Sequence, residues 1–181
     1  LSGGTITVYP SSKNKLISNE NTIIGNTVLY GATTGKLFAS GQAGERFAVR
    51  NSGSLSVIEG CGAHGCEYMT GGTAIILGPV GDNFGAGMTG GMAFVYDTKD
   101  EFENFANPAS IIWQQIETDF WKTFLKENLN EFLKETNSVV AKEILDDFEV
   151  ELKKFKQICP VEMLDKLDNP ITLKSTIKKV S

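Results

Sequence analysis

The densest group of residues that could do chemistry is the string CGAHGCE at residues 61–67. It holds the single histidine of the chain, His64, and two of its three cysteines, Cys61 and Cys66. Two thiols and an imidazole could bind zinc, but a closed site needs four ligands, and the CxxHxC spacing matches no common zinc signature. Cys66 and His64 could form a nucleophile and its base, yet no acid that would orient the imidazole is evident. We therefore expect a structural turn here, with no catalytic residue and no metal ligand.

A second candidate is the glycine-rich run Gly85-Ala86-Gly87 with Gly90 and Gly91, which superficially resembles a dinucleotide fingerprint. A phosphate-binding loop of that kind lies between a strand and a helix whose N-terminus faces the pyrophosphate. This run leads instead into a second β segment, AFVY at residues 93–96. We therefore expect no cofactor-binding residue in the chain.

Composition limits which classes of partner and which cellular compartment are expected. The net charge is −5, and no run of five or six like charges is present, which argues against nucleic acid as a partner. No stretch approaches 18 apolar residues and no signal peptide is visible, so we expect neither a membrane span nor secretion. The odd number of cysteines, three, favours a reducing compartment, either the cytoplasm or an organelle matrix. The start at Leu1, without an initiator Met, suggests a domain cut from a longer protein.

Glycine divides the chain into two parts. All 19 glycines lie between Gly3 and Gly91, and residues 1–97 carry only 6 acidic and 5 basic side chains. The remainder has no glycine and most of the charge. We therefore expect one domain at residues 1–97 and a second, helical region at 98–181 that packs on it.

The glycines of the first part recur at a fixed interval. The tetrapeptide MTGG occurs at 69–72 and again at 88–91, and each copy runs into an apolar strand, AIIL at 74–77 and AFVY at 93–96. Earlier strands at 55–59 and 36–40 end before Gly60 and Gly41, and LSGG at 1–4 begins another copy, followed by an insertion at about 11–20.

A repeat of about 19 extended residues gives a path of roughly 60 Å, enough for one solenoid coil with several straight faces. The sequence thus predicts a mainly β fold, a right-handed parallel β-helix. Stacked corners need residues that tolerate positive φ or close backbone contact, a role that suits glycine. The glycines expected to act as structural turn residues are Gly41, Gly60, Gly71, Gly72, Gly78, Gly90 and Gly91.

The second part shows helical periodicity. Apolar residues recur every three or four positions from Trp113 to Leu133, which predicts a helix over about 110–134. Asn137 or Ser138 can cap a second helix, whose stripe runs from Val140 to Phe155 and stops before Pro160. A short third helix is expected from Pro160 to about 167. We expect this α-helical tail to cap the open end of the β-helix, because that end exposes unpaired strand edges.

Charged residues recur at one corner of successive coils. Glu45, Arg46 and Arg50 lie beside apolar positions of one coil, and Glu67 lies in the next. Such groups either bond to one another between coils or face a neighbouring domain, and the sequence leaves both open.

Residues 25–97 closely resemble the C-terminal domain of the glutamate synthase large subunit, the GXGXG domain. The motifs that carry the resemblance are AGERFAVRNSG, CEYMTGG and FGAGMTGG. LSGGTITVYP at the start, with ETNSVVAKEIL and FKQICP later, are similar to the flanking parts of that family, so only about the last dozen residues fall outside. The chain departs from the family at GATTG, which lacks a second glycine, and at Ala63, where an acid is common.

The resemblance implies a division of labour. In glutamate synthase, an amidotransferase domain releases ammonia from glutamine, and a domain with FMN and an iron-sulfur cluster reduces 2-iminoglutarate to glutamate. The β-helix is a non-catalytic scaffold for these parts, so the resemblance implies amidotransferase and FMN-binding parts as partners and no cofactor in this chain. Two alternatives are a stand-alone GXGXG interaction subunit and a component of formylmethanofuran dehydrogenase, an enzyme in which one subunit has a related solenoid.

Overall fold

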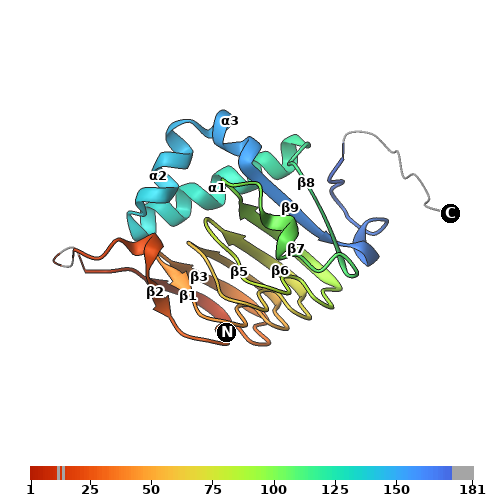
Figure 1. Ribbon diagram of the computed structural model, residues 1–181, viewed down its shortest axis with the longest axis horizontal. Coiled ribbons are helices and arrows are strands. Elements are labelled where there is room, and N and C mark those ends of the chain that lie inside the picture. The colour runs from red at the N-terminus through yellow and green to blue at the C-terminus, as the bar shows by residue number, and fades with distance from the viewer. Residues whose placement is uncertain (12, 14, 173–181) are drawn as a thin grey trace.

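The computed structural model describes residues 1–11, 13 and 15–172. Its centre is a parallel β-solenoid of stacked coils, with helices along one side (Figure 1). The strands are β1 (Ser2–Val8), β2 (Thr22–Ile24), β3 (Thr34–Ala39), β4 (Gln42–Ala43), β5 (Ser52–Ile58), β6 (Thr70–Ile76), β7 (Gly90–Tyr96), β8 (Ile111–Gln114) and β9 (Phe155–Pro160). The helices are η1 (Ser18–Glu20), η2 (Phe102–Asn104), α1 (Asp119–Thr136), α2 (Val139–Asp146), α3 (Phe148–Glu151), η3 (Leu152–Lys154) and η4 (Val161–Met163).

The register of the main sheet confirms the predicted solenoid and its repeat. Strands β1, β3, β5, β6 and β7 lie side by side in parallel, in the order in which the chain reaches them. Lys36 pairs with Leu55, Leu55 with Thr73 and Thr73 with Met92, which are steps of 19, 18 and 19 residues. The first step is longer, from Thr5 to Lys36, because the insertion lies between β1 and β3.

Strands β5, β6 and β7 bury both faces of their apolar runs. At successive positions of β6, Ala74 and Ile76 face the interior of the solenoid, whereas Ile75 faces the helices. Strands that are covered on both faces are nearly continuous apolar runs, which explains the strings AIIL and AFVY. The strands begin earlier than these strings, so that Gly71, Gly72, Gly90 and Gly91 lie inside β6 and β7.

Helix α1 crosses the outer face of the sheet. Phe124 packs near Phe94 of β7, with ring centroids 6.2 Å apart, and Phe132 packs edge-on against Phe38 of β3 at 5.9 Å. Ser138 caps α2 as expected, since its side chain accepts a hydrogen bond from the Ala141 N–H. The helices therefore complete a second apolar layer outside the sheet.

The predicted extents of the helices were wrong in two places. Residues 111–114, expected to begin the first helix, form strand β8, and residues 155–160, expected to end the second, form strand β9. The second helix also breaks at Asp147, which has φ −136° and ψ 54°. Only the 3₁₀ turn η4 follows Pro160 where a third helix was expected.

These two strands, rather than the helices, complete the final edge of the sheet. β9 runs antiparallel to β7, and β8 pairs antiparallel with β9 on its other side. The unpaired backbone groups of β7 are satisfied in this way, which a helix cannot do. The tail is thus helical as expected, but its helices cover a face of the sheet and its strands cover the edge. At the other end, β1 pairs with β3 alone, and Ile6 is 48% exposed.

Candidate functional site

The corner that carries Cys66 and His64 has an unusual backbone, repeated in four coils. At every second residue φ is positive, which is rare outside glycine. The twelve positions are Thr27, Leu29 and Gly31; Arg46, Ala48 and Arg50; His64, Cys66 and Tyr68; and Asn83, Gly85 and Gly87. Hydrogen bonds from these residues go alternately to the following and the preceding coil: Arg46 N–H donates to Ala63 O and Ala48 N–H to Val28 O. We call this column the left-handed corner.

The left-handed corner separates the residues that the sequence placed together. The Cys66 side chain is fully buried in the interior of the solenoid, and Cys61 is 6% exposed there. The His64 side chain is instead 33% exposed, and its Nδ1 lies 3.4 Å from Glu67 Oε1 without hydrogen-bond geometry. His64 therefore pairs with an acid on the outside, while the thiols belong to the core.

Burial also sets the state of the thiols. It raises the pKa of Cys61 to about 12 and that of Cys66 well above its ordinary value, where the neighbouring Cys61 adds to the effect. The pKa of Cys159 is raised to about 11 by burial as well. A thiol is a nucleophile or metal ligand only as the thiolate, so these three groups are poor candidates for either role at neutral pH. Within the described residues, no three His, Cys, Asp or Glu side chains gather as a metal site.

The seven glycines named from the sequence lie where consecutive coils touch. A Cβ at Gly71 or Gly90, at the start of β6 and β7, would lie 2.3 and 2.0 Å from a carbonyl oxygen of the preceding coil. Gly72 and Gly91 have φ of +78° and +81°, and a Cβ there would lie 2.4 Å from Ser54 O and 2.7 Å from the Met69 side chain. The other three, Gly41, Gly60 and Gly78, follow strands of the main sheet at the corner beyond them. A Cβ at Gly78 would lie 2.3 Å from Glu59 O, whereas one at Gly41 or Gly60 would first meet the side chain of Ile23 or Gln42.

A buried carboxylate that sequence reasoning missed links the solenoid to α2. Glu59 has no exposed surface, and its Oε1 accepts hydrogen bonds from Ser40 Oγ at 3.0 Å and Ser138 Oγ at 2.5 Å. Because Ser138 is the N-cap of α2, the positive end of that helix faces the carboxylate. Oε2 has no hydrogen-bond partner among the described atoms. The available signal was the 19-residue step from Ser40 to Glu59, which places both side chains in one column.

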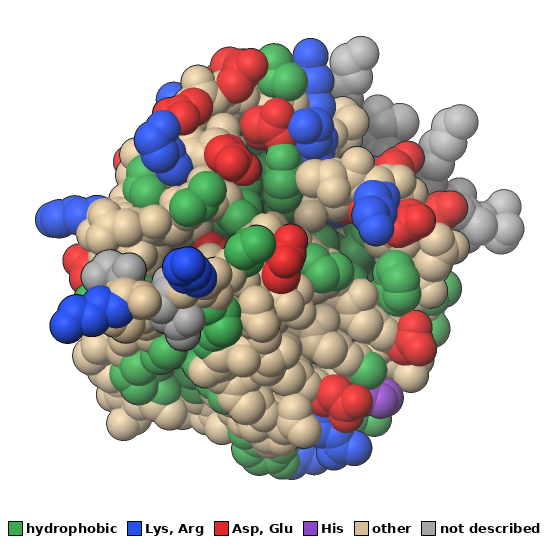
Figure 2. Space-filling view, turned by 60° about the vertical axis from the view of Figure 1, so that its left-hand side comes forward, with side chains coloured by type: hydrophobic (Ala, Val, Ile, Leu, Met, Phe, Trp, Pro, Cys, Tyr) green, Lys and Arg blue, Asp and Glu red, His purple; other side chains and the backbone are tan. Residues whose placement is uncertain are grey.

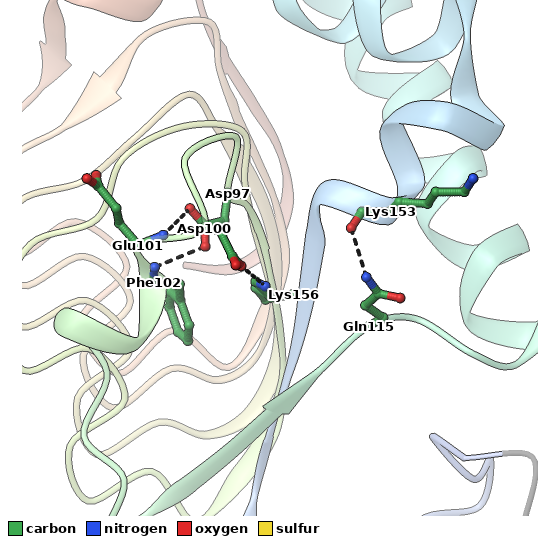
Figure 3. A network of polar contacts seen from close by, with 7 residues as sticks. All are labelled: Asp97, Asp100, Glu101, Phe102, Gln115, Lys153 and Lys156. Atoms are coloured by element: carbon green, nitrogen blue, oxygen red, sulfur yellow. Dashed lines mark hydrogen bonds and ion pairs between the residues drawn. The ribbon is translucent and has the colours of Figure 1, made fainter.

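The loop after β7 is also held by a carboxylate (Figure 3). Asp97 accepts hydrogen bonds from the backbone N–H groups of Glu101 and Phe102, each at 3.0 Å. Asp100 forms an ion pair with Lys156 of β9, so the loop is tied to the strand that completes the sheet. Gln115 Nε2 donates to Lys153 O nearby at 3.3 Å, joining the segments that precede α1 and β9. These contacts fix the position of the loop after β7 and of the segment before α1.

This loop borders a hollow of about 530 Å³ between the solenoid and α2. Its walls combine apolar side chains, including Leu77, Phe102 and Val140, with polar and charged ones, including Glu101 and Glu143. Figure 2 shows acidic and basic side chains interspersed over the upper part of one face, while the surface below is mostly uncharged apart from a charged cluster at its lower edge. The hollow contains neither of the cysteines nor the histidine of the left-handed corner.

Comparison with known proteins identifies relatives over almost the whole chain. The family model described as GXGXG motif matches residues 1–161. The glutamate synthase [NADPH] large chain of Azospirillum brasilense is 59% identical over 177 residues, 98% of this chain and 12% of that protein. The glutamate synthase [NADH] of Schizosaccharomyces pombe is 43% identical over 180 residues, 99% of this chain and 8% of that protein.

A third relative, the ferredoxin-dependent glutamate synthase of Antithamnion sp., is 48% identical over 160 residues, 88% of this chain and 10% of that protein. The chain thus spans about a tenth of the length of these relatives. Separately, none of the helices in the described part of the chain is long and apolar enough to cross a membrane.

Proposed function

Since the chain belongs to the GXGXG motif family, we propose that it is a non-catalytic scaffold domain of a glutamate synthase, the enzyme that makes glutamate from glutamine and 2-oxoglutarate. In this proposal the domain positions the amidotransferase part and the FMN-binding part of the enzyme. FMN and the iron-sulfur cluster are held by other domains. The three free, buried cysteines favour a reducing compartment, the cytoplasm or an organelle matrix.

The proposal rests mainly on where the potentially reactive side chains lie and what they contact. The thiols of Cys61, Cys66 and Cys159 lie in the core, and their burial keeps them protonated. The side chain of Glu59 accepts hydrogen bonds from two serine hydroxyls. His64 has one acidic neighbour and no nucleophile beside it. The thiols pack in the two apolar clusters, and Glu59 links the solenoid to α2, which is what a rigid support requires.

The relatives add a second argument. They are named for three electron donors, NADPH, NADH and ferredoxin, yet each is 43% or more identical to this chain over the matched region. A domain that recognised the donor would have to differ between them. A supporting role does not depend on the electron donor.

Flavin binding tests the proposal. The purified chain is titrated with FMN at micromolar concentrations while flavin fluorescence is followed, and glutamine hydrolysis is assayed on the same sample. We expect no change in fluorescence and no glutamate release. The assembled enzyme, treated identically, is the positive control for both assays. Stoichiometric flavin binding or glutamine turnover by the chain alone would refute the non-catalytic role.

A further inference from the structure

Three side chains stand out on the outside of the left-handed corner: Tyr30, Arg50 and Tyr68, here called the corner patch. The tyrosines are 54% and 53% exposed, and the Arg50 guanidinium carbon lies 5.9 Å from the centre of the Tyr30 ring. The Tyr68 ring lies over the next coil, where a Cβ at Gly87 would come within 2.5 Å of it. The patch therefore spans successive coils with two aromatic rings and one guanidinium group.

The backbone does not require two of these side chains, Arg50 and Tyr68. Arg50 and Tyr68 have φ of 55° and 54°, a conformation that is unfavourable for residues with a Cβ. The same column position is occupied by Gly31 in the coil before and by Gly87 in the coil after, both with positive φ. Glycine would serve the backbone better in the middle coils as well. Stacking between coils therefore explains the backbone conformation at these two positions, but not the choice of an arginine and a tyrosine there.

The use of arginine points in the same direction. The chain has 17 basic residues, and only Arg46 and Arg50 are arginines, both exposed and both on the left-handed corner. Neither forms an ion pair within the described part of the chain. Arginine differs from lysine in its planar, bidentate recognition of carboxylates and in its stacking on aromatic rings. Arginine and tyrosine are also enriched among the residues that dominate protein interfaces.

We infer that the corner patch is the surface on which a carboxylate-bearing face of another domain of the assembled glutamate synthase docks. This inference rests on the proposed scaffold function and adds the place of contact. The patch lies on an outer corner and does not line the hollow beside α2. It also does not line a second, shallower hollow at the start of α1, beside Phe120 and Phe124. It therefore suits a protein surface better than a small anion. A carboxylate from the partner would supply the ion pair that Arg50 lacks, flanked by the two rings.

Hydroxyl-radical footprinting of the assembled enzyme tests this inference. The oxidation rates of Tyr30 and Tyr68 are compared with the rates of the same residues in the unfolded enzyme. Tyrosines at the centre of an interface should react at least about fivefold more slowly than tyrosines that are half exposed. Rates that match half-exposed tyrosines would overturn the inference. Protection that disappears on dilution into separate protomers would assign the patch to a second copy, which also overturns it.

Arg50→Gly makes the test sharper because it removes the guanidinium while giving the backbone the residue found in the flanking coils. We expect the melting temperature of the variant enzyme to be unchanged or higher, and the oxidation of Tyr30 and Tyr68 to rise several-fold. Arg46→Gly is the matched control, since it removes the other arginine from the same coil and should leave both rates unchanged. Equal rises in both variants, or none in either, would contradict the assignment.

The readout does not depend on turnover. If the docking inference is wrong, the oxidation rates of Tyr30 and Tyr68 show it. If the proposed scaffold function is wrong, the chain alone binds flavin or hydrolyses glutamine.

Discussion

Cys66 and His64 are two residues apart, yet their side chains leave the left-handed corner on opposite sides. Both have positive φ, so the sign of φ does not distinguish them, yet Cys66 lies in the core and His64 is partly exposed. In the preceding coil Ala48 is likewise buried between the exposed Arg46 and Arg50. Spacing alone therefore says little about which residues meet at this corner. The thiols are built into the interior, and their chemistry follows from that burial.

Burial of the thiols predicts how stability depends on pH. The pKa of Cys61 is raised from an ordinary 9.0 to about 12, so the folded protein keeps a proton that the unfolded chain releases. The stabilisation is complete below pH 9.0 and is lost as the pH rises from there toward about 12. We expect the free energy of unfolding, measured in urea, to fall above pH 9 by up to about 1.4 kcal/mol per pH unit for each such thiol.

The control for this dependence is the variant Cys61→Ala/Cys66→Ala, which carries the residue found at the same position in the neighbouring coil, Ala43 and Ala48. Its decline above pH 9 should be shallower. If the two slopes are equal, the thiols do not contribute. In the parent protein, a thiol reagent at pH 8 should modify three cysteines after unfolding and almost none before.

The Glu59 contact to Ser138 predicts strong coupling between the solenoid and α2. Glu59→Ala leaves two buried hydroxyls without their acceptor and should cost about 2 kcal/mol. Ser138→Ala removes that bond and the helix cap and should cost about 1–2 kcal/mol. Because the two residues share one hydrogen bond, the double variant should be at least about 0.5 kcal/mol less destabilised than the sum of the single variants. Additive losses in urea denaturation would show that the bond contributes nothing.

At the scale of the elements, two glycines with similar φ distinguish the free-energy cost of backbone strain from the cost of overlap with the preceding coil. Gly4 and Gly72 have nearly the same φ, +73° and +78°, but a Cβ at Gly4 meets nothing within 4 Å, whereas one at Gly72 lies 2.4 Å from Ser54 O. Gly4→Ala should therefore cost only the backbone strain, about 1 kcal/mol. Gly72→Ala adds overlap with the preceding coil and should cost about 3 kcal/mol.

Thermal and urea unfolding of the two variants measure this difference. The account of the glycines as stacking residues requires Gly72→Ala to be clearly the worse of the two. Equal losses would mean that conformation alone, and not the contact between coils, selects glycine at these positions.

The repeat was visible in the sequence because each coil must make the same packing contacts. The string MTGG followed by an apolar strand meets this requirement in two consecutive coils. The tail was harder to predict. Ile111, Ile112 and Trp113 alternate between the two apolar clusters, as a strand requires, but Ile116 and Phe120 extend their spacing into a helical pattern. What decides the matter is strand pairing. β9 covers the open edge of β7, β8 pairs with the other edge of β9, and these partners lie far from residues 111–114 in the sequence.

The left-handed corner could not be predicted for a similar reason. Its positions hold Arg, His, Cys and Tyr as well as glycine and asparagine, so composition did not indicate positive φ there. Stacking between coils imposes that conformation on residues that would not choose it. The Glu59 contact is equally non-local, since Ser138 lies 79 residues further along the chain.

At the scale of the whole molecule, the solenoid and its outer helical layer share two apolar clusters, and the three cysteines lie in them. The chain spans about a tenth of the length of the relatives it matches, and in the proposed scaffold role it would act by positioning the other domains. Two kinds of change in the assembled enzyme should therefore have opposite consequences. Substitution of the potentially reactive side chains should leave glutamate synthesis nearly unchanged, whereas substitutions that disrupt the stacking of the coils should abolish it.

The most direct test is glutamine-dependent glutamate synthesis by the assembled enzyme carrying either of two variants. In the first, His64→Asn/Cys66→Ala, each residue is replaced by its equivalent in a neighbouring coil, Asn83 and Ala48. We expect its rate to stay within about twofold of the parent, because a role in the chemical step would cost far more. In the second, Gly72→Val, the clash between coils should lower glutamate synthesis at least about tenfold through loss of the folded domain. A loss of activity in the first variant with full activity in the second would contradict the scaffold role.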